Sequence, residues 1–118
     1  MRKLKESQRE ELAKKLIELI EKLEFDDFTF VYYNGKKIEL TQGEKKESEG
    51  RIDETLEEKY AKNAEILITF EGIMHDVVSS RSWPELNELF MNKLEEILEK
   101  YSVDFELIHS WAMGIYKK

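Results

Sequence analysis

The dipeptide Asn34-Gly35 separates two short runs of strand-forming residues and limits the fold more than any other feature of the chain. Residues 28–33 are aromatic and β-branched, and residues 36–41 alternate polar with apolar side chains. A two-residue hairpin turn needs positive φ at both positions, which Asn and Gly tolerate best. The sequence therefore predicts an antiparallel hairpin with a fixed register, in which Val31 faces Ile38.

This hairpin has two different faces, because successive side chains of a strand point in opposite directions. One face carries Val31, Ile38 and Leu40, and we expect it to contact the core. The other carries an aromatic row opposed by charged and polar residues. The row consists of Phe28, Phe30 and Tyr32.

Two amphipathic helices are predicted over residues 7–24 and 83–100. In both ranges apolar residues recur with the i, i+3, i+4, i+7 spacing of a helix that has one buried face. Each range begins with the Ser-x-x-Glu pattern of a capping box, at Ser7 and at Ser82.

The remaining segments are assigned by alternation and polarity. Residues 65–71 alternate as a strand, and residues 103–117 form either a hairpin or one long strand bent at a bulge. Residues 52–62 are a short helix or a further strand. Residues 42–51 hold no apolar side chain and are predicted to be a mobile charged loop.

Together these elements predict the order α-β-β-(α)-β-α-β-β. Because strand pairs are consecutive, we expect an α+β fold, with a mainly antiparallel sheet of four to five strands and both amphipathic helices gathered on one face. A length of 118 residues is typical of one domain, so residues 1–118 are taken as a single domain.

Composition excludes several classes of function. There is no cysteine, which excludes disulfides, thiolate metal sites and cysteine nucleophiles. The formal net charge is −7, a sign that disfavours direct binding to duplex nucleic acid. No phosphate-binding glycine motif is present. The sequence therefore predicts no cofactor, no metal and no enzymatic activity.

No signal peptide and no apolar run long enough for a membrane span are visible in the sequence. We therefore expect a cytoplasmic protein that does not bind membranes, located in the host cytoplasm if a phage encodes it.

The main functional hypothesis is a non-enzymatic protein-binding module that binds a basic, nucleic-acid-binding protein. The aromatic row would supply an apolar patch, and glutamates of the second helix would supply the attracting field. These glutamates are Glu85, Glu88, Glu95, Glu96 and Glu99. In composition alone, the chain is similar to small phage or mobile-element inhibitors such as anti-CRISPR proteins and DNA mimics.

Two alternatives stay open. One is a small-ligand-binding or hydrolytic domain centred on residues 71–83, where His75, Asp76, Arg81 and Trp83 would line a pocket. The other is a structural homo-oligomer, including a homodimer, without a further partner.

Overall fold

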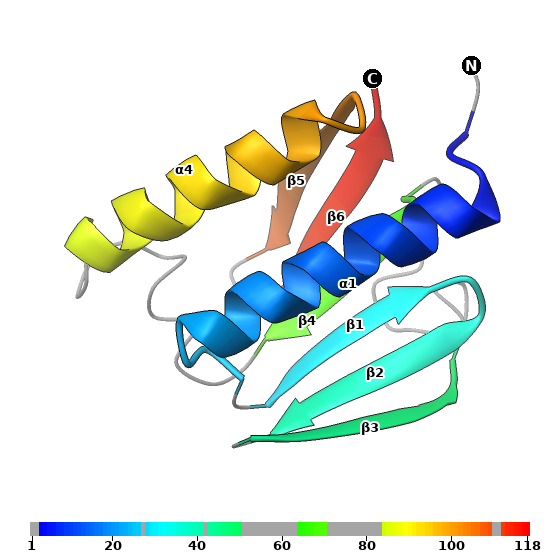
Figure 1. Ribbon diagram of the computed structural model, residues 1–118, viewed down its shortest axis with the longest axis horizontal. Coiled ribbons are helices and arrows are strands. Elements are labelled where there is room, and N and C mark those ends of the chain that lie inside the picture. The colour runs from blue at the N-terminus through cyan, green and yellow to red at the C-terminus, as the bar shows by residue number, and fades with distance from the viewer. Residues whose placement is uncertain (1–2, 27, 42, 51–63, 71–83, 110–111) are drawn as a thin grey trace.

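A computed structural model describes residues 3–26, 28–41, 43–50, 64–70, 84–109 and 112–118 of the protein, and Figure 1 shows their arrangement. This part of the chain forms two helices and six strands, which confirms the predicted α+β class. The elements are α1 (Glu6–Lys22), β1 (Thr29–Tyr33), β2 (Lys36–Thr41), β3 (Glu44–Glu49), β4 (Ile66–Phe70), α4 (Pro84–Glu99), β5 (Val103–His109) and β6 (Ala112–Lys117).

The six strands make one antiparallel sheet in the order β3-β2-β1-β4-β6-β5. Helices α1 and α4 both lie on one face of this sheet, as predicted (Figure 1). The first hairpin pairs with β4, which in turn pairs with the C-terminal hairpin. Long-range pairing by β4 thus joins the two halves of the sheet.

The predicted register of the first hairpin is confirmed. Val31 pairs with Ile38 and Tyr33 with Lys36. Both turn residues have positive φ, 49° at Asn34 and 74° at Gly35, as a two-residue hairpin turn requires. The C-terminal segment is also a hairpin, so of the two alternatives the single bent strand is wrong.

The prediction of a mobile charged loop over residues 42–51 is wrong for Glu44–Glu49, which form β3. This strand accounts for the sheet having more than the four to five strands predicted. All six of its residues are exposed, so no apolar alternation marks it in the sequence. Backbone pairing with β2 stabilises it instead, and the pair of Lys46 with Glu39 places opposite charges across the two strands. Gly43, with φ of 86°, occupies a turn position that favours glycine.

Helix α1 begins before the predicted capping box. Its N-cap is Lys5, and the side chain of Gln8 accepts a hydrogen bond of 2.9 Å from the Lys5 backbone N–H. The prediction that Ser7 and Glu10 cap the helix is therefore wrong. The physical reason lies in tertiary structure, because Leu4 is buried and its backbone N–H donates to the carboxylate of Glu65. Helix α4 agrees with the predicted range to within one residue, whereas Ser82 and residues 52–62 lie outside the described residues.

The core lies between the two helices and the sheet. Leu12, Leu16 and Ile20 of α1 and Phe90, Leu94 and Leu98 of α4 are buried in one cluster with residues of the strands. The ring of Phe90 meets that of Phe25 edge to face, with centroids 5.7 Å apart. This cluster confirms that the apolar stripes of both predicted helices face the sheet. Neither described helix is long and apolar enough to cross a membrane.

A polar network centred on Arg9 joins the start of α1 to the sheet. The Arg9 guanidinium donates to Asn34 Oδ1 at 2.6 Å and to the Leu4 carbonyl at 2.7 Å. It also lies 3.6 Å from a carboxylate oxygen of Glu65, whose side chain is almost wholly buried. The Asn34 amide donates in turn to the carbonyl of Glu6 at 2.9 Å. The hairpin turn and the first turn of α1 therefore hold each other in place.

Replacing Phe90 with Ala should lower the free energy of unfolding by about 3–5 kcal/mol, because it opens a cavity beside Phe25. Phe28→Ala is the matched control, since the Phe28 side chain is 54% exposed and its truncation should cost less than about 1 kcal/mol. Urea unfolding followed by circular dichroism measures both values. Equal losses in the two variants would contradict the assignment of the core.

Replacing Arg9 with Met should cost about 3 kcal/mol, because the buried carboxylate of Glu65 loses its cationic neighbour. Lys15→Met removes a cation from the same helix, but its partner Glu11 is exposed, and we expect a loss below about 1 kcal/mol. Chemical denaturation of the two variants under identical conditions tests the difference. A loss for Arg9→Met no larger than for Lys15→Met would show that the network contributes little.

Candidate functional site

The five predicted glutamates all lie on α4, and all five are exposed. Successive residues of a helix are rotated by about 100°, so these positions fall within an arc of roughly 100° on its outer side. Within the described part of the chain, the five carboxylates make no ion pair. We call this set, Glu85, Glu88, Glu95, Glu96 and Glu99, the glutamate stripe.

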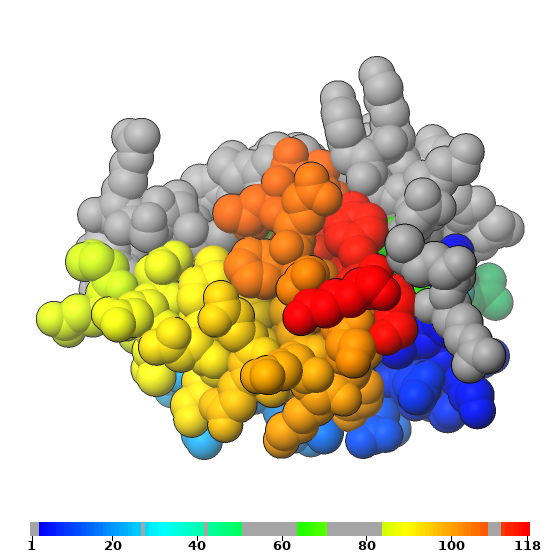
Figure 2. All heavy atoms as spheres, turned by 90° about the horizontal axis from the view of Figure 1, so that it is seen from above, coloured from blue at the N-terminus to red at the C-terminus, as the bar shows by residue number. Residues whose placement is uncertain are grey.

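The glutamate stripe borders the edge strand β5. A shallow pocket of about 270 Å³ lies between α4 and β5, and Glu95, Glu99 and Asp104 contribute carboxylates to its lining. Lys118 lines the same pocket, and its ammonium group lies 3.7 Å from Asp104. Figure 2 shows α4, in yellow to orange, continuous with the C-terminal hairpin, in orange to red. Carboxylates are therefore found from the helix to the sheet edge, where Lys118 pairs with the carboxylate of Asp104.

The aromatic row is only partly as predicted. Phe30 and Tyr32 lie on β1 and are half-buried, on the sheet face opposite the helices. Phe28 precedes the strand with φ of 50°, so it does not pair with Thr41 as the predicted register requires. Lys37 places its ammonium group 5.5 Å from the centre of the Phe30 ring. This cation–π contact covers part of the row with a charged side chain.

Neighbouring positions on the same face are also covered. Leu67 pairs with Tyr32 across the sheet and has no exposed surface. Thr69, which pairs with Phe30, is buried as well. The face opposite the helices is therefore not a bare apolar patch around Phe30 and Tyr32.

The structure separates the two halves of the predicted binding surface. Val31, between Phe30 and Tyr32, points into the core under the helices, so its neighbours point away from it. Helix α4 lies on the helix side of the sheet (Figure 1). The glutamate stripe and the aromatic row therefore lie on opposite faces and do not form one surface.

The alternative pocket of His75, Asp76, Arg81 and Trp83 lies outside the described residues. Among the described residues, no group of three or more His, Asp or Glu side chains has the arrangement needed to hold a metal ion.

A groove of about 490 Å³ separates α1 from α4 on the outer side of the helix layer. Its floor includes Leu19, Leu23 and Ile97, and Leu89 at its edge is 42% exposed. The charged lining of the groove consists of four lysines and two glutamates: Lys15, Lys22, Lys93, Lys100, Glu18 and Glu96. Glu96 of the glutamate stripe also lines this groove, together with Lys93 and Lys100.

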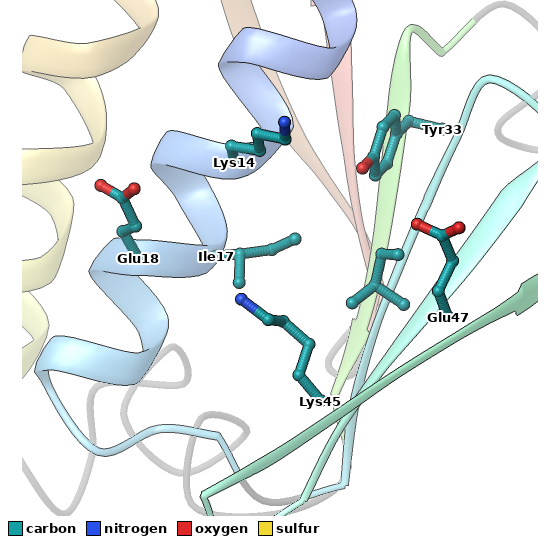
Figure 3. Close-up of a pocket in the computed structure, with 7 residues that line it drawn as sticks. Lys14, Ile17, Glu18, Tyr33, Lys45 and Glu47 are labelled. Carbon is teal, nitrogen blue, oxygen red and sulfur yellow. The ribbon is translucent and has the colours of Figure 1, made fainter.

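A further pocket of about 320 Å³ lies between α1 and the β1–β2–β3 end of the sheet (Figure 3). Ile17 comes from α1, Tyr33 and Ile38 from the first hairpin, and Lys45 from β3. Burial raises the pKa of the Tyr33 hydroxyl above its ordinary value, although the nearby Lys36 lowers it. The hydroxyl is therefore protonated at neutral pH and can donate a hydrogen bond.

Sequence reasoning missed this pocket, because one wall belongs to β3, which was predicted to be a loop. The signal that was present is the position of Tyr33, on the face of the hairpin predicted to contact the core but at its very end, next to the turn. A polar hydroxyl at such a position reaches the border between core and solvent.

No family model, no curated protein and no solved structure matches this chain.

Proposed function

We propose that this protein is a non-enzymatic binding module whose glutamate stripe docks on a basic protein. The observation that carries the proposal is the set of five exposed carboxylates on one side of α4, none of which makes an ion pair with another described residue. Keeping like charges together on one helix face is unfavourable for the isolated protein. A partner with lysines and arginines relieves this repulsion, and the gain favours association.

Charge on neighbouring elements also favours a basic binding partner. Asp104 continues the row of carboxylates onto β5, where Lys118 pairs with it, and residues 64–118 carry 10 acidic against 5 basic side chains. A field of this sign repels nucleic acid and attracts proteins that bind nucleic acid. A nucleic-acid-binding protein is thus the partner class that best fits, with the carboxylates occupying the place of phosphates. An inhibitor of the DNA-mimic or anti-CRISPR kind would act in this way.

The proposal confines docking to α4 and the β5 edge. Phe28, Phe30 and Tyr32 are not part of the same contact, since they lie across the sheet from the stripe. Apolar contacts at the acidic surface would come instead from Leu107 of β5, which is 44% exposed. This geometry favours an interface with a carboxylate centre and only a small apolar contribution.

Neutralising the stripe should abolish capture of the partner. The variant carries Glu→Gln at positions 85, 88, 95, 96 and 99, which removes five negative charges but keeps the size and helix propensity of each side chain. Immobilised wild-type protein should retain a basic protein from host extract at low salt, and the variant should retain less than about a tenth as much. Quantitative mass spectrometry of the eluates measures the ratio.

A matched control separates the stripe from net charge. It carries Glu→Gln at five exposed positions outside α4, namely Glu11, Glu18, Glu24, Glu44 and Glu49. Its net charge equals that of the stripe variant, so we expect capture within about twofold of wild type if local charge decides. Equal loss of partner capture in both variants, or no loss in either, would contradict the proposal.

A further inference from the structure

Tyr33 is 3% exposed, yet its hydroxyl lies at the wall of the pocket beneath α1. Figure 3 shows this hydroxyl pointing toward Ile17 and Lys14, which line the same pocket. Within the described residues the hydroxyl makes no hydrogen bond. Among the described buried side-chain polar atoms only the Tyr101 hydroxyl lacks a partner, so the Tyr33 hydroxyl is open to the pocket, and a ligand that accepts its hydrogen bond would displace water there.

The pocket has the size and lining of a small-molecule site. Its volume of about 320 Å³ lies at the lower end of the range typical of such sites. Ile17, Ile38 and the ring of Tyr33 provide apolar walls. The pocket arises because α1 covers β1 and β2, whereas β3 extends the sheet beyond the helix with exposed residues.

The lining of the pocket holds two lysines, Lys14 and Lys45, and two glutamates, Glu18 and Glu47, so the placement of these groups and not their number decides which ligand charge fits. Lys14 from α1 and Lys45 from β3 place two ammonium groups at its border, and Lys45 lies 3.7 Å from Glu21. Lys14 makes no ion pair with a described residue and extends toward Tyr33 (Figure 3). The carboxylate of Glu18 points away from the tyrosine in the same view.

The remaining acid limits how much negative charge the ligand can carry. Glu47 from β3 pairs with Ile38 of β2 and lines the pocket on the side of Tyr33 (Figure 3). A second anionic group on the ligand would meet this carboxylate and be repelled. The lining therefore selects one negative charge next to an apolar body.

We propose that this pocket binds a small aliphatic monocarboxylate. The Tyr33 hydroxyl donates to the ligand carboxylate, Lys14 balances its charge, and Ile17 and Ile38 contact the aliphatic chain. The site is separate from the glutamate stripe and does not depend on the protein partner proposed above, so either proposal can fail without the other.

Isocaproate is a suitable probe because it has one carboxylate and a branched chain small enough for the pocket. Titration into ¹⁵N-labelled full-length protein should give saturable shifts of the amide signals of Ile17, Tyr33 and Ile38. The neutral amide of the same acid has the same shape but no charge. It should bind at least about tenfold more weakly, because charge-assisted hydrogen bonds are the stronger ones.

Two variants test the donors. Tyr33→Phe removes only the hydroxyl and should weaken isocaproate binding about tenfold. Lys14→Gln removes the charge of an exposed side chain and should weaken it up to about fivefold. Lys46→Gln is the control. Lys46 follows Lys45 on β3, but it pairs with Glu39 and lies on the face of the sheet opposite the pocket. The Lys46→Gln variant should bind isocaproate with the affinity of the wild-type protein.

The amide spectrum of each variant also reports whether the fold is retained, and Lys14→Gln alone decides the outcome if Tyr33→Phe does not fold. Three results would each overturn the proposal. They are the absence of saturable shifts at the pocket, equal affinity for isocaproate and its amide, and unchanged affinity in every donor variant that folds.

Discussion

Burial of alternate residues of β1 against α1 is the constraint on which the rest of the structure depends. Thr29, Val31 and Tyr33 are all buried, and Val31 and Tyr33 belong to the core that both helices cover. Because side chains alternate along a strand, Phe30 and Tyr32 must then point to the opposite face. This alternation places the aromatic row and the glutamate stripe on opposite faces of the sheet. It also carries Tyr33, the last residue of the strand, to the rim of the core, where its hydroxyl borders the pocket beneath α1.

Much of the fold could be predicted because local rules and tertiary packing agree. The Asn34-Gly35 turn determines the register of the first hairpin, since a two-residue loop leaves no freedom to shift it. The same turn is then held by α1, because Asn34 bonds both Arg9 and the carbonyl of Glu6. The apolar residues of α1 and α4 recur with helical spacing in the sequence because they form the helix faces that the core buries. The same burial turns these faces toward the sheet.

The errors arise where backbone pairing or a distant residue decides the structure. Strand β3 buries no side chain, so a method that searches for apolar alternation cannot find it. Its exposed lysines and glutamates are typical of an edge strand, which charged residues protect from further pairing. The N-terminus of α1 is set by Leu4 and Glu65, residues 61 positions apart, and no local capping pattern reports such a contact.

In the candidate sites too, features that follow from local periodicity could be predicted and features that depend on tertiary contacts could not. The exposure of the glutamates on α4 could be predicted, because helix periodicity alone places them opposite the buried stripe. Their separation from the aromatic row could not, because it depends on which face of the sheet the helices cover. The pocket at Tyr33 depends on the contact between α1 and a strand that was predicted to be a loop.

The salt dependence of the association rate with the captured partner tests the central claim most directly, because steering by the glutamate stripe must weaken as ions screen it. Stopped-flow measurements between 50 and 500 mM NaCl should show the wild-type rate falling by about tenfold or more. The association rate of the stripe variant should be lower at 50 mM NaCl and should change little as the salt concentration rises. A wild-type rate that stays constant over this range would contradict an electrostatic basis for the function.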